Sequence, residues 1–397
     1  MHRSHSKLIF TLLALMTLVA GVSMAQVPRS KHVYVVAEEN HSYEHMVGSR
    51  YMPYFNSLIA KGGLATQFYA DMHGSLENYL ILTSGQYLTR NNDTTTVFNV
   101  DNIERHLLTH GMTFKSYAES LPYAGYTGLY SGSYVKRHAP LPYYTDMAHS
   151  TLIRDHLSTN MLATDIANGT LANFGFITPN LLHDIHNCPN GLNACLQTAD
   201  NWLKAHIAPL LTRPEFQPGG DGLLILWADE ADLSTDNRCS ATVSTGCGGR
   251  IPVALIGPQV KAGYKSTRTY HHSSVLRTIL EAMGTTSNFP GKANTAPDMA
   301  EFFKSSASST PVTGSVKISA PTTSTVIGTT VRLAASASGP HPITAMRIYV
   351  DNVSKYFVHA ASVSTQLSMS TGSHHLVFQA WDSTGAVFKA LKTITVQ

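Results

Sequence analysis

The sequence predicts an α/β protein with a mainly parallel sheet covered by helices on both faces, followed by a small all-β sandwich. Strand-like apolar runs alternate with helical stretches between residues 30 and 303, which is typical of such a sheet. The composition then becomes rich in Ser, Thr, Ala, Pro and Gly over residues 304–314, as in a linker. Residues 315–397 hold short runs with a period of two, which is typical of a β-sandwich.

The elements of the first region follow from the hydrophobic pattern. Buried strands are predicted where short apolar runs occur, at Val33–Ala37, Leu64–Tyr69, Thr113–Tyr117, Phe174–Thr178, Leu223–Ala228 and Ile251–Ile256. Helices are predicted between them, for example at Pro53–Lys61, Asn102–His110, Thr198–Leu211 and Ser273–Met283. Ligands of such sheets bind at the carboxyl ends of the strands, so polar residues that follow a strand are the candidates for function.

The N-terminus has the pattern of a secretory signal peptide. Arg3 and Lys7 precede the apolar run Leu8–Met16, and small residues follow as far as Ala25. A membrane anchor would need a longer apolar run. We therefore expect residues 1–25 to be removed and the mature protein to be secreted or periplasmic, with a catalytic domain at 26–303, a linker at 304–314 and a sandwich at 315–397.

The composition excludes some partners. Charged residues make up only 13% of the 397 residues, and the formal net charge is +3. It falls to +1 without residues 1–25, since that segment holds two basic residues and no acidic ones. This leaves no basic field for nucleic acid. No other segment is long and apolar enough to span a bilayer.

The four cysteines are Cys188, Cys195, Cys239 and Cys247. An even number in an exported chain favours disulfides. Three connectivities are possible, and pairing of neighbours, 188 with 195 and 239 with 247, is favoured because each bond would close a short polar loop. The alternative is a zinc site, although the spacings are not Cys-x-x-Cys.

Two predicted strands end in acidic pairs. Glu39-Asn40 follows the first strand, and Asp229-Glu230 follows Leu223–Ala228. Carboxylate and amide oxygens are good ligands for hard or borderline cations. The alternative for Asn40 is a helix N-cap.

Ser75 is the candidate nucleophile. It stands between a predicted strand and an apolar helical stretch, where the positive helix end and its free N–H groups favour an anion. A hydroxyl needs a base or a metal to become a good nucleophile. Asn78 lies one turn later, where its side-chain amide could face the same anion, such as a phosphate. The alternative is that Ser75 only caps the helix.

Further metal-ligating residues follow other strands. Asp184 and His186 lie in the loop after Phe174–Thr178, and His272 stands directly before a helix. Solvated side chains, or capping of that helix by Ser273, are the alternatives. Together the candidates would supply a nucleophile and the ligands of about two cations. The carboxylate-rich set permits Ca, Mg, Mn, Fe or Zn.

The order of these motifs, over roughly residues 31–285, resembles the phosphoesterase family of bacterial and fungal acid phosphatases and phosphatidylcholine-type phospholipases C. That family belongs to the alkaline-phosphatase-like superfamily. The segments that carry the resemblance are Glu39–Tyr43, His73–Tyr79, Thr178–His186, Trp227–Glu230, Gly248–Val253 and Tyr270–His272. Three departures are Gly74 in place of Pro, Glu77 in place of a frequent Pro, and Ala228 inside the Trp-Asp-Glu run.

The resemblance implies that Ser75 is the nucleophile. In the mechanism that we expect, Asn78 steadies the phosphoryl oxygens, and the attacking water is activated by the metal or deprotonated by His272 or His186. A metal touching Ser75 would be held by Glu39, Asn40, Asp229 and Glu230. Asp184, His186 and His272 would form or border a second site.

We therefore expect a secreted, metal-dependent, acid-phosphatase-like hydrolase of phosphomonoesters that works through a phosphoserine. The alternatives are a phospholipase C or phosphodiesterase with the same site, acting on a phospholipid or other diester, and a catalytically inactive secreted binding or adhesion protein. The C-terminal region resembles bacterial immunoglobulin-like modules. We expect a spacer or adhesive module there, with the cell surface or a polysaccharide as its candidate contact.

Overall fold

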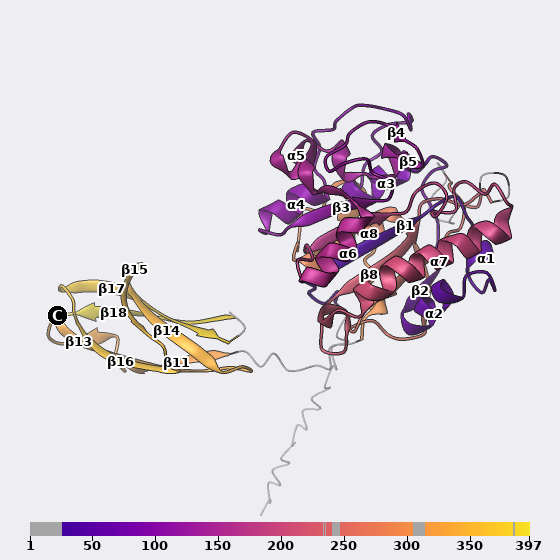
Figure 1. Ribbon diagram of the computed structural model, residues 1–397. Helices are drawn as coiled ribbons and strands as arrows, with labels where there is room; N and C mark the ends of the chain where they lie inside the picture. The colour runs from indigo at the N-terminus through magenta and orange to yellow at the C-terminus, as the bar shows by residue number, and fades with distance from the viewer. Residues whose placement is uncertain (1–25, 233, 235, 240–246, 305–313, 384–385) are drawn as a thin grey trace, which may run out of the picture. The chain divides into compact units, whose positions relative to one another are not determined.

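The computed structural model describes residues 26–232, 234, 236–239, 247–304, 314–383 and 386–397. The predicted signal peptide and nearly all of the predicted linker lie outside the described residues. The chain divides into two compact units, Met1–Ser305 and Ser306–Gln397, and each is described by itself (Figure 1).

The first unit is built on one eight-stranded sheet with the order β10-β2-β9-β8-β1-β7-β3-β6. Only β9 runs antiparallel to its neighbours, and the other neighbouring strands pair in parallel. The strands are β1 (Val33–Glu38), β2 (Gly63–Phe68), β3 (Phe114–Ala118), β6 (His156–Ser158), β7 (Phe174–Thr178), β8 (Leu223–Ala228), β9 (Val253–Ile256) and β10 (Tyr264–Tyr270). The predicted mainly parallel sheet is confirmed.

Helices cover both faces of this sheet, and one hydrophobic cluster lies on each face. One face carries α3 (Ser75–Ser84), α4 (Ile103–Thr109) and α8 (His272–Met283). The other carries α2 (Pro53–Lys61), α6 (Thr159–Asn168) and α7 (Leu192–Leu211). The short helices α1 (Tyr43–Met46) and α5 (Thr145–Ala148) and the two-residue strands β4 (Tyr130–Ser131) and β5 (Tyr134–Val135) lie in connections. The central strands β1, β7 and β8 are buried at every residue, which explains their continuous apolar runs.

Some elements differ from the prediction. Helix α7 begins at Leu192, between one and two turns before the predicted Thr198. Strands β6 and β10 and helix α6 were not predicted, since β6 has three residues and β10 is largely polar and partly exposed. Both predicted disulfides are present, Cys188–Cys195 and Cys239–Cys247.

The second unit is entirely β. A three-stranded sheet, β11-β13-β16, and a five-stranded sheet, β12-β18-β17-β14-β15, share one hydrophobic core. The strands are β11 (Ser315–Ala320), β12 (Thr325–Val326), β13 (Thr330–Ser338), β14 (Ile343–Val350), β15 (Val353–Val358), β16 (Ser362–Ser368), β17 (Gly372–Asp382) and β18 (Val387–Val396). The predicted period-two pattern is confirmed. Across the described residues of both units, we find no helix with the length and apolar character that a membrane span requires.

Candidate active site

The loops that follow β1, β7 and β8 are bound to one another at the carboxyl edge of the sheet. The backbone N–H of Glu39 donates to the carbonyl of Asp184 at 2.7 Å, and the N–H of Asp229 donates to the carbonyl of Glu38 at 3.1 Å. Since these strands are adjacent and parallel, their predicted functional residues meet at one place, as expected for this class of sheet.

Glu39 is at the centre of the site and is fully buried. Its Oε2 accepts a hydrogen bond from Ser75 Oγ at 3.1 Å, and its Oε1 accepts one from the Tyr79 hydroxyl at 2.6 Å. Ser75 is the first residue of α3 and is 4% exposed. Burial, then the charge of Asp229, raises the pKa of the Glu39 carboxyl well above its usual value. Because this carboxylate is desolvated, a bound cation would stabilise it strongly.

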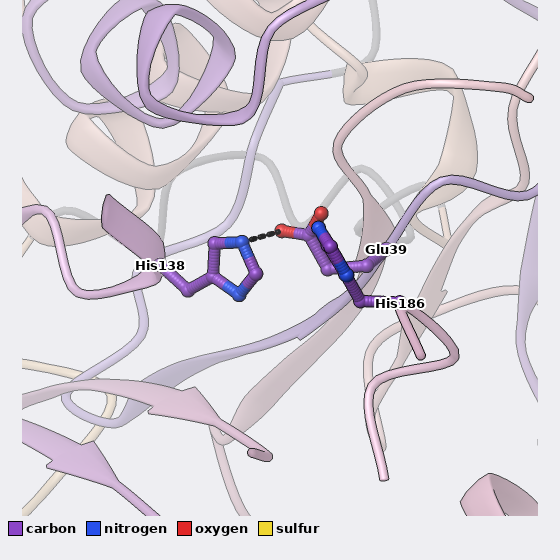
Figure 2. A group of neighbouring side chains, drawn as sticks. All are labelled: Glu39, His138 and His186. Atoms are coloured by element: carbon purple, nitrogen blue, oxygen red, sulfur yellow. Dashed lines mark ion pairs between the residues drawn. The ribbon is translucent and has the colours of Figure 1, made fainter. Parts of the chain in front are cut away.

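His138 contacts the same carboxylate, and the sequence reasoning missed it. Its Nε2 lies 3.2 Å from Glu39 Oε1 (Figure 2), and its Nδ1 lies 3.0 Å from Asp184 Oδ2. The imidazole stacks on the Tyr79 ring, with 5.6 Å between centroids and an interplanar angle of 5°. His138 ends a single 3₁₀ turn after β5. No acidic or metal-ligating neighbour in the sequence marks it.

The atoms around Glu39 suit a divalent cation. One ligand atom each from Glu39, His138 and His186 lie within 4.8 Å of one another, and Figure 2 shows the three side chains together. If His138 donates its Nδ1 proton to Asp184, its Nε2 lone pair faces the Glu39 oxygen with no proton between them, and Nε2 has no hydrogen-bond partner. A carboxylate and two imidazoles are common ligands of transition metals. The residues therefore fit the predicted metal.

His186 forms the outer side of this group. Its backbone N–H donates to Asp184 Oδ1 at 2.8 Å, and its Nδ1 lies 2.9 Å from the Asn187 side-chain oxygen. Burial lowers the pKa of His186 and that of His138, so both imidazoles are neutral near pH 7, as metal ligands must be.

The other predicted ligands gather at the same edge but contact backbone groups. Asp229 Oδ1 accepts from the N–H groups of Asn40 (3.1 Å) and Glu230 (2.7 Å), while its buried Oδ2 has no hydrogen-bond partner. Asn40 has a φ of 52°, which asparagine tolerates. Glu230 Oε2 accepts from the Gly74 N–H at 2.6 Å and lies 3.3 Å from His73 Nδ1. Glu230 thus holds the loop that precedes Ser75.

Asn78 and His272 are bonded to each other and to neighbouring protein groups. The Asn78 amide bonds to both backbone groups of Met72, at 2.9 and 3.1 Å. The Trp227 indole N–H donates to His272 Nδ1 at 2.9 Å, so His272 Nε2 carries the proton and donates to Asn78 Oδ1 at 3.1 Å. His272 is fully buried, and burial lowers its pKa to about 4. With these contacts Asn78 and His272 support the loop that precedes Ser75.

A cavity of about 450 Å³ opens beside Gly74, the residue that precedes Ser75. Its walls come from the loops after β1, β2, β7 and β8, and the lining residues are Asn40, His41, His73, Gly74, Asn92, His186, Glu230, Ala231 and Asp232. None of these is Lys or Arg. An anionic phosphate in this cavity would therefore depend on a metal, on imidazoles or on N–H groups for its counter-charge.

The chain is similar to one protein family and to several proteins named as phosphatases. The model of the Phosphoesterase family matches residues 49–285. A phosphatidylinositol-3-phosphatase of Mycobacterium tuberculosis is 27% identical over 285 residues, which are 71% of this chain and 86% of that protein. An acid phosphatase of Aspergillus fumigatus is 31% identical over 251 residues, 61% of this chain and 52% of that protein. The chain spans about half the length of the fungal relatives it matches.

A protein in the alkaline phosphatase superfamily from Vibrio parahaemolyticus is 12% identical, with a TM-score of 0.46 over 91% of this chain and 83% of that one. The lipoteichoic acid synthase LtaP from Listeria monocytogenes is 11% identical, with a TM-score of 0.49 over 91% of this chain and 87% of that one. Both TM-scores are below 0.5, so the fold is described from the strand order of the sheet alone.

Proposed function

The chain belongs to the Phosphoesterase family, and we propose that it is a secreted, metal-dependent phosphatase that hydrolyses small phosphomonoesters through a phosphoserine at Ser75. The observation that carries the proposal is the hydrogen bond from Ser75 Oγ to Glu39 Oε2, 3.1 Å long and buried. It joins a candidate nucleophile to a carboxylate that also faces two imidazoles.

The chain's own residues account for the first chemical step. Ser75 Oγ attacks phosphorus, the Oγ–P bond forms, and the P–O bond to the leaving alcohol breaks. The existing hydrogen bond gives the Ser75 proton a path to Glu39 Oε2. The N-terminal end of α3 directs its positive dipole toward the reacting phosphate. The leaving oxygen takes the proton that Glu39 accepted and departs as the alcohol. Water then attacks phosphorus, one of its protons passes to Ser75 Oγ as the Oγ–P bond breaks, and phosphate is released.

A metal would be held by Glu39, His138 and His186, and Asp229 has an unbonded buried oxygen to offer. When bound, it supplies positive charge for the phosphoryl oxygens and lowers the pKa of a coordinated hydroxyl or water. Two imidazoles in the group favour Fe or Zn over Ca or Mg. Of the two histidines predicted to be catalytic, His186 lines the cavity, whereas His272 is fully buried with its ring nitrogens bonded to Trp227 and Asn78, so we propose the catalytic role for His186.

Secretion is part of the proposal. It is supported by the signal-peptide pattern of residues 1–25 and by two disulfides, which persist in oxidising compartments.

The test is Ser75→Ala, compared with Ser273→Ala as a matched control. Ser273 is also buried in the first turn of a helix, and its Oγ has no hydrogen-bond partner. Ser75→Ala should lower kcat for p-nitrophenyl phosphate by at least ~10³-fold, with metal content and thermal unfolding close to wild type. A chelator should silence the wild type and the control. Near-normal turnover by Ser75→Ala would contradict the phosphoserine mechanism.

A lipid phosphomonoester is a second candidate substrate, since the mycobacterial relative is named a phosphatidylinositol-3-phosphatase, and phospholipase C remains the alternative with the same site. Rates on a soluble monoester, on phosphatidylinositol 3-phosphate in vesicles and on phosphatidylcholine separate the possible substrates. Hydrolysis of phosphatidylcholine faster than of any monoester would replace phosphatase by phospholipase C. Absence of chelator-sensitive turnover on every substrate would favour the inactive binding protein.

A further inference from the structure

The outward face of the five-stranded sheet in the second unit carries a group of aromatic and basic side chains. On β14, Met346 and Ile348 belong to the core, so Arg347 between them points to the opposite face. On β17, Phe378 and Ala380 belong to the core, and Trp381 points outward by the same alternation. This sheet includes the labelled strands β14, β15, β17 and β18 in Figure 1.

Two rings on this face hold a guanidinium group. Arg347 Cζ lies 4.7 Å from the centre of the Phe357 ring and 5.7 Å from that of Trp381. The two rings are 6.4 Å apart at an angle of 64°, and the His359 ring is 4.8 Å from Phe357. Phe357 is 40% exposed although it is a large apolar side chain.

The guanidinium has no acidic partner among the described residues. Its Nε is buried and makes no hydrogen bond, and no ion pair involves Arg347. A cation fixed between aromatic rings has lost much of its side-chain freedom already, so binding an anion through its remaining N–H groups costs less entropy than for a free arginine.

A second cation lies in the same cross-strand row. The strand register places Phe357, Arg347, Gln379 and Lys389 side by side on β15, β14, β17 and β18. Arg347 and Lys389 are two strands apart, which corresponds to about 10 Å. Exposed apolar side chains continue the face on β18, where Val387 is 47% and Leu391 is 63% exposed.

The second unit as a whole is positively charged, like the outward face of its five-stranded sheet. Residues 314–397 contain six lysines and arginines and only two acidic residues. Asp351 bonds to the His374 ring and to the His375 N–H, and Asp382 is buried. The outward face is therefore a basic surface with exposed aromatic rings, and a protein exposes such a surface rarely unless it binds something.

We propose that this face binds an acidic polysaccharide, with its sugar rings against Trp381 and Phe357 and its carboxylates on Arg347 and Lys389. A sheet face with cations spaced along one row suits a linear polymer with repeated negative charges. The planar guanidinium can bind a carboxylate through two N–H groups. Each contact is weak, and a repeating polymer strengthens them by offering many equivalent sites.

The experiment uses the full-length protein with polygalacturonate as the probe and dextran as the neutral control, in affinity electrophoresis and calorimetry. The variants Arg347→Gln and Lys389→Gln test whether the two cations of the cross-strand row bind the polymer. Arg332→Gln is the matched control, because Arg332 is an exposed arginine of the same unit on β13 in the other sheet. We expect Arg347→Gln to weaken polygalacturonate binding by about tenfold or more, Arg332→Gln to change it less than about twofold, and added salt to weaken it.

Three results would overturn the proposal. If Arg347→Gln and Arg332→Gln weakened polygalacturonate binding equally, the net charge of the unit would explain the effect without a specific site. Equal binding of dextran would remove the requirement for acid groups. Binding to phosphatidylglycerol vesicles through Arg347, without binding to polygalacturonate, would identify a membrane as the partner. Hydrolysis of p-nitrophenyl phosphate should be unchanged in all three variants, so this test succeeds or fails independently of the phosphatase assignment.

Discussion

Tyr79→Phe is the sharpest test of how the site is held together. The Tyr79 hydroxyl donates to Glu39 Oε1 at 2.6 Å, and both side chains are fully buried. Removing the hydroxyl leaves the carboxylate oxygen without that donor. Glu39 is charged when a cation is bound. A hydrogen bond to a charged group contributes about 1.5–3 kcal/mol, so the free energy of unfolding of the metal-loaded protein should fall by about 2 kcal/mol. A residue that orients a metal ligand typically changes metal affinity or activity by about 10–100-fold, and we expect a loss of that size.

Tyr143→Phe is the matched control for this change. Tyr143 is equally buried, but its hydroxyl has no hydrogen-bond partner, so deleting it should be neutral or slightly stabilising. Urea unfolding gives the stability of both variants, and hydrolysis of p-nitrophenyl phosphate over a metal titration gives affinity and kcat. If Tyr79→Phe matched the wild type in all three quantities, or if Tyr143→Phe lost as much, the view of Glu39 as a carboxylate oriented by Tyr79 would be wrong.

Two further predictions concern pH. Burial lowers the pKa of His156 from 6.5 to about 3. Below pH 6.5 this histidine is therefore protonated in the unfolded chain but stays neutral in the folded chain. The free energy of unfolding should fall by about 2 kcal/mol between pH 6.5 and 5. His156→Gln should flatten this part of a urea-unfolding profile, and an unchanged slope would contradict it. Burial, followed by the charge of Asp146, raises the pKa of the Glu104 carboxyl. Ionisation of this buried carboxyl therefore lowers the free energy of unfolding as the pH rises above the pKa of Glu104 in the unfolded chain. Glu104→Gln should therefore stabilise at pH 7.5 and have little effect at pH 4, and the reverse order would refute this reasoning.

The fold was predictable where burial dominates the sequence pattern. Strands β7 and β8 and helix α2 match their predicted ranges, because strands buried on both faces must be apolar throughout. The antiparallel direction of β9 was not predictable, since the residues of a buried strand read the same in either direction. Strand β10 was missed because it is largely polar and partly exposed.

Within the site, the sequence could predict residues that follow strands but not the direction of every side chain. Glu39 and Ser75 were predicted to meet, and they lie within hydrogen-bond distance. Asn78 was expected to face phosphate because it lies one turn after Ser75. At that position its amide can reach either the cavity or the preceding loop, and only the tertiary contacts with Met72 and His272 decide between them.

His138 shows what sequence reasoning lacked. Its neighbours Lys136 and Arg137 are basic, and a basic run suggests an exposed surface, yet His138 is 1% exposed. It reaches Glu39 and Asp184 because the hairpin of β4 and β5 brings a distant connection to the sheet edge. Glu39 therefore contacts the nucleophile through one oxygen, and Tyr79 and His138 through the other. The position of Ser75 and the geometry of the metal group therefore depend on the orientation of the same carboxylate.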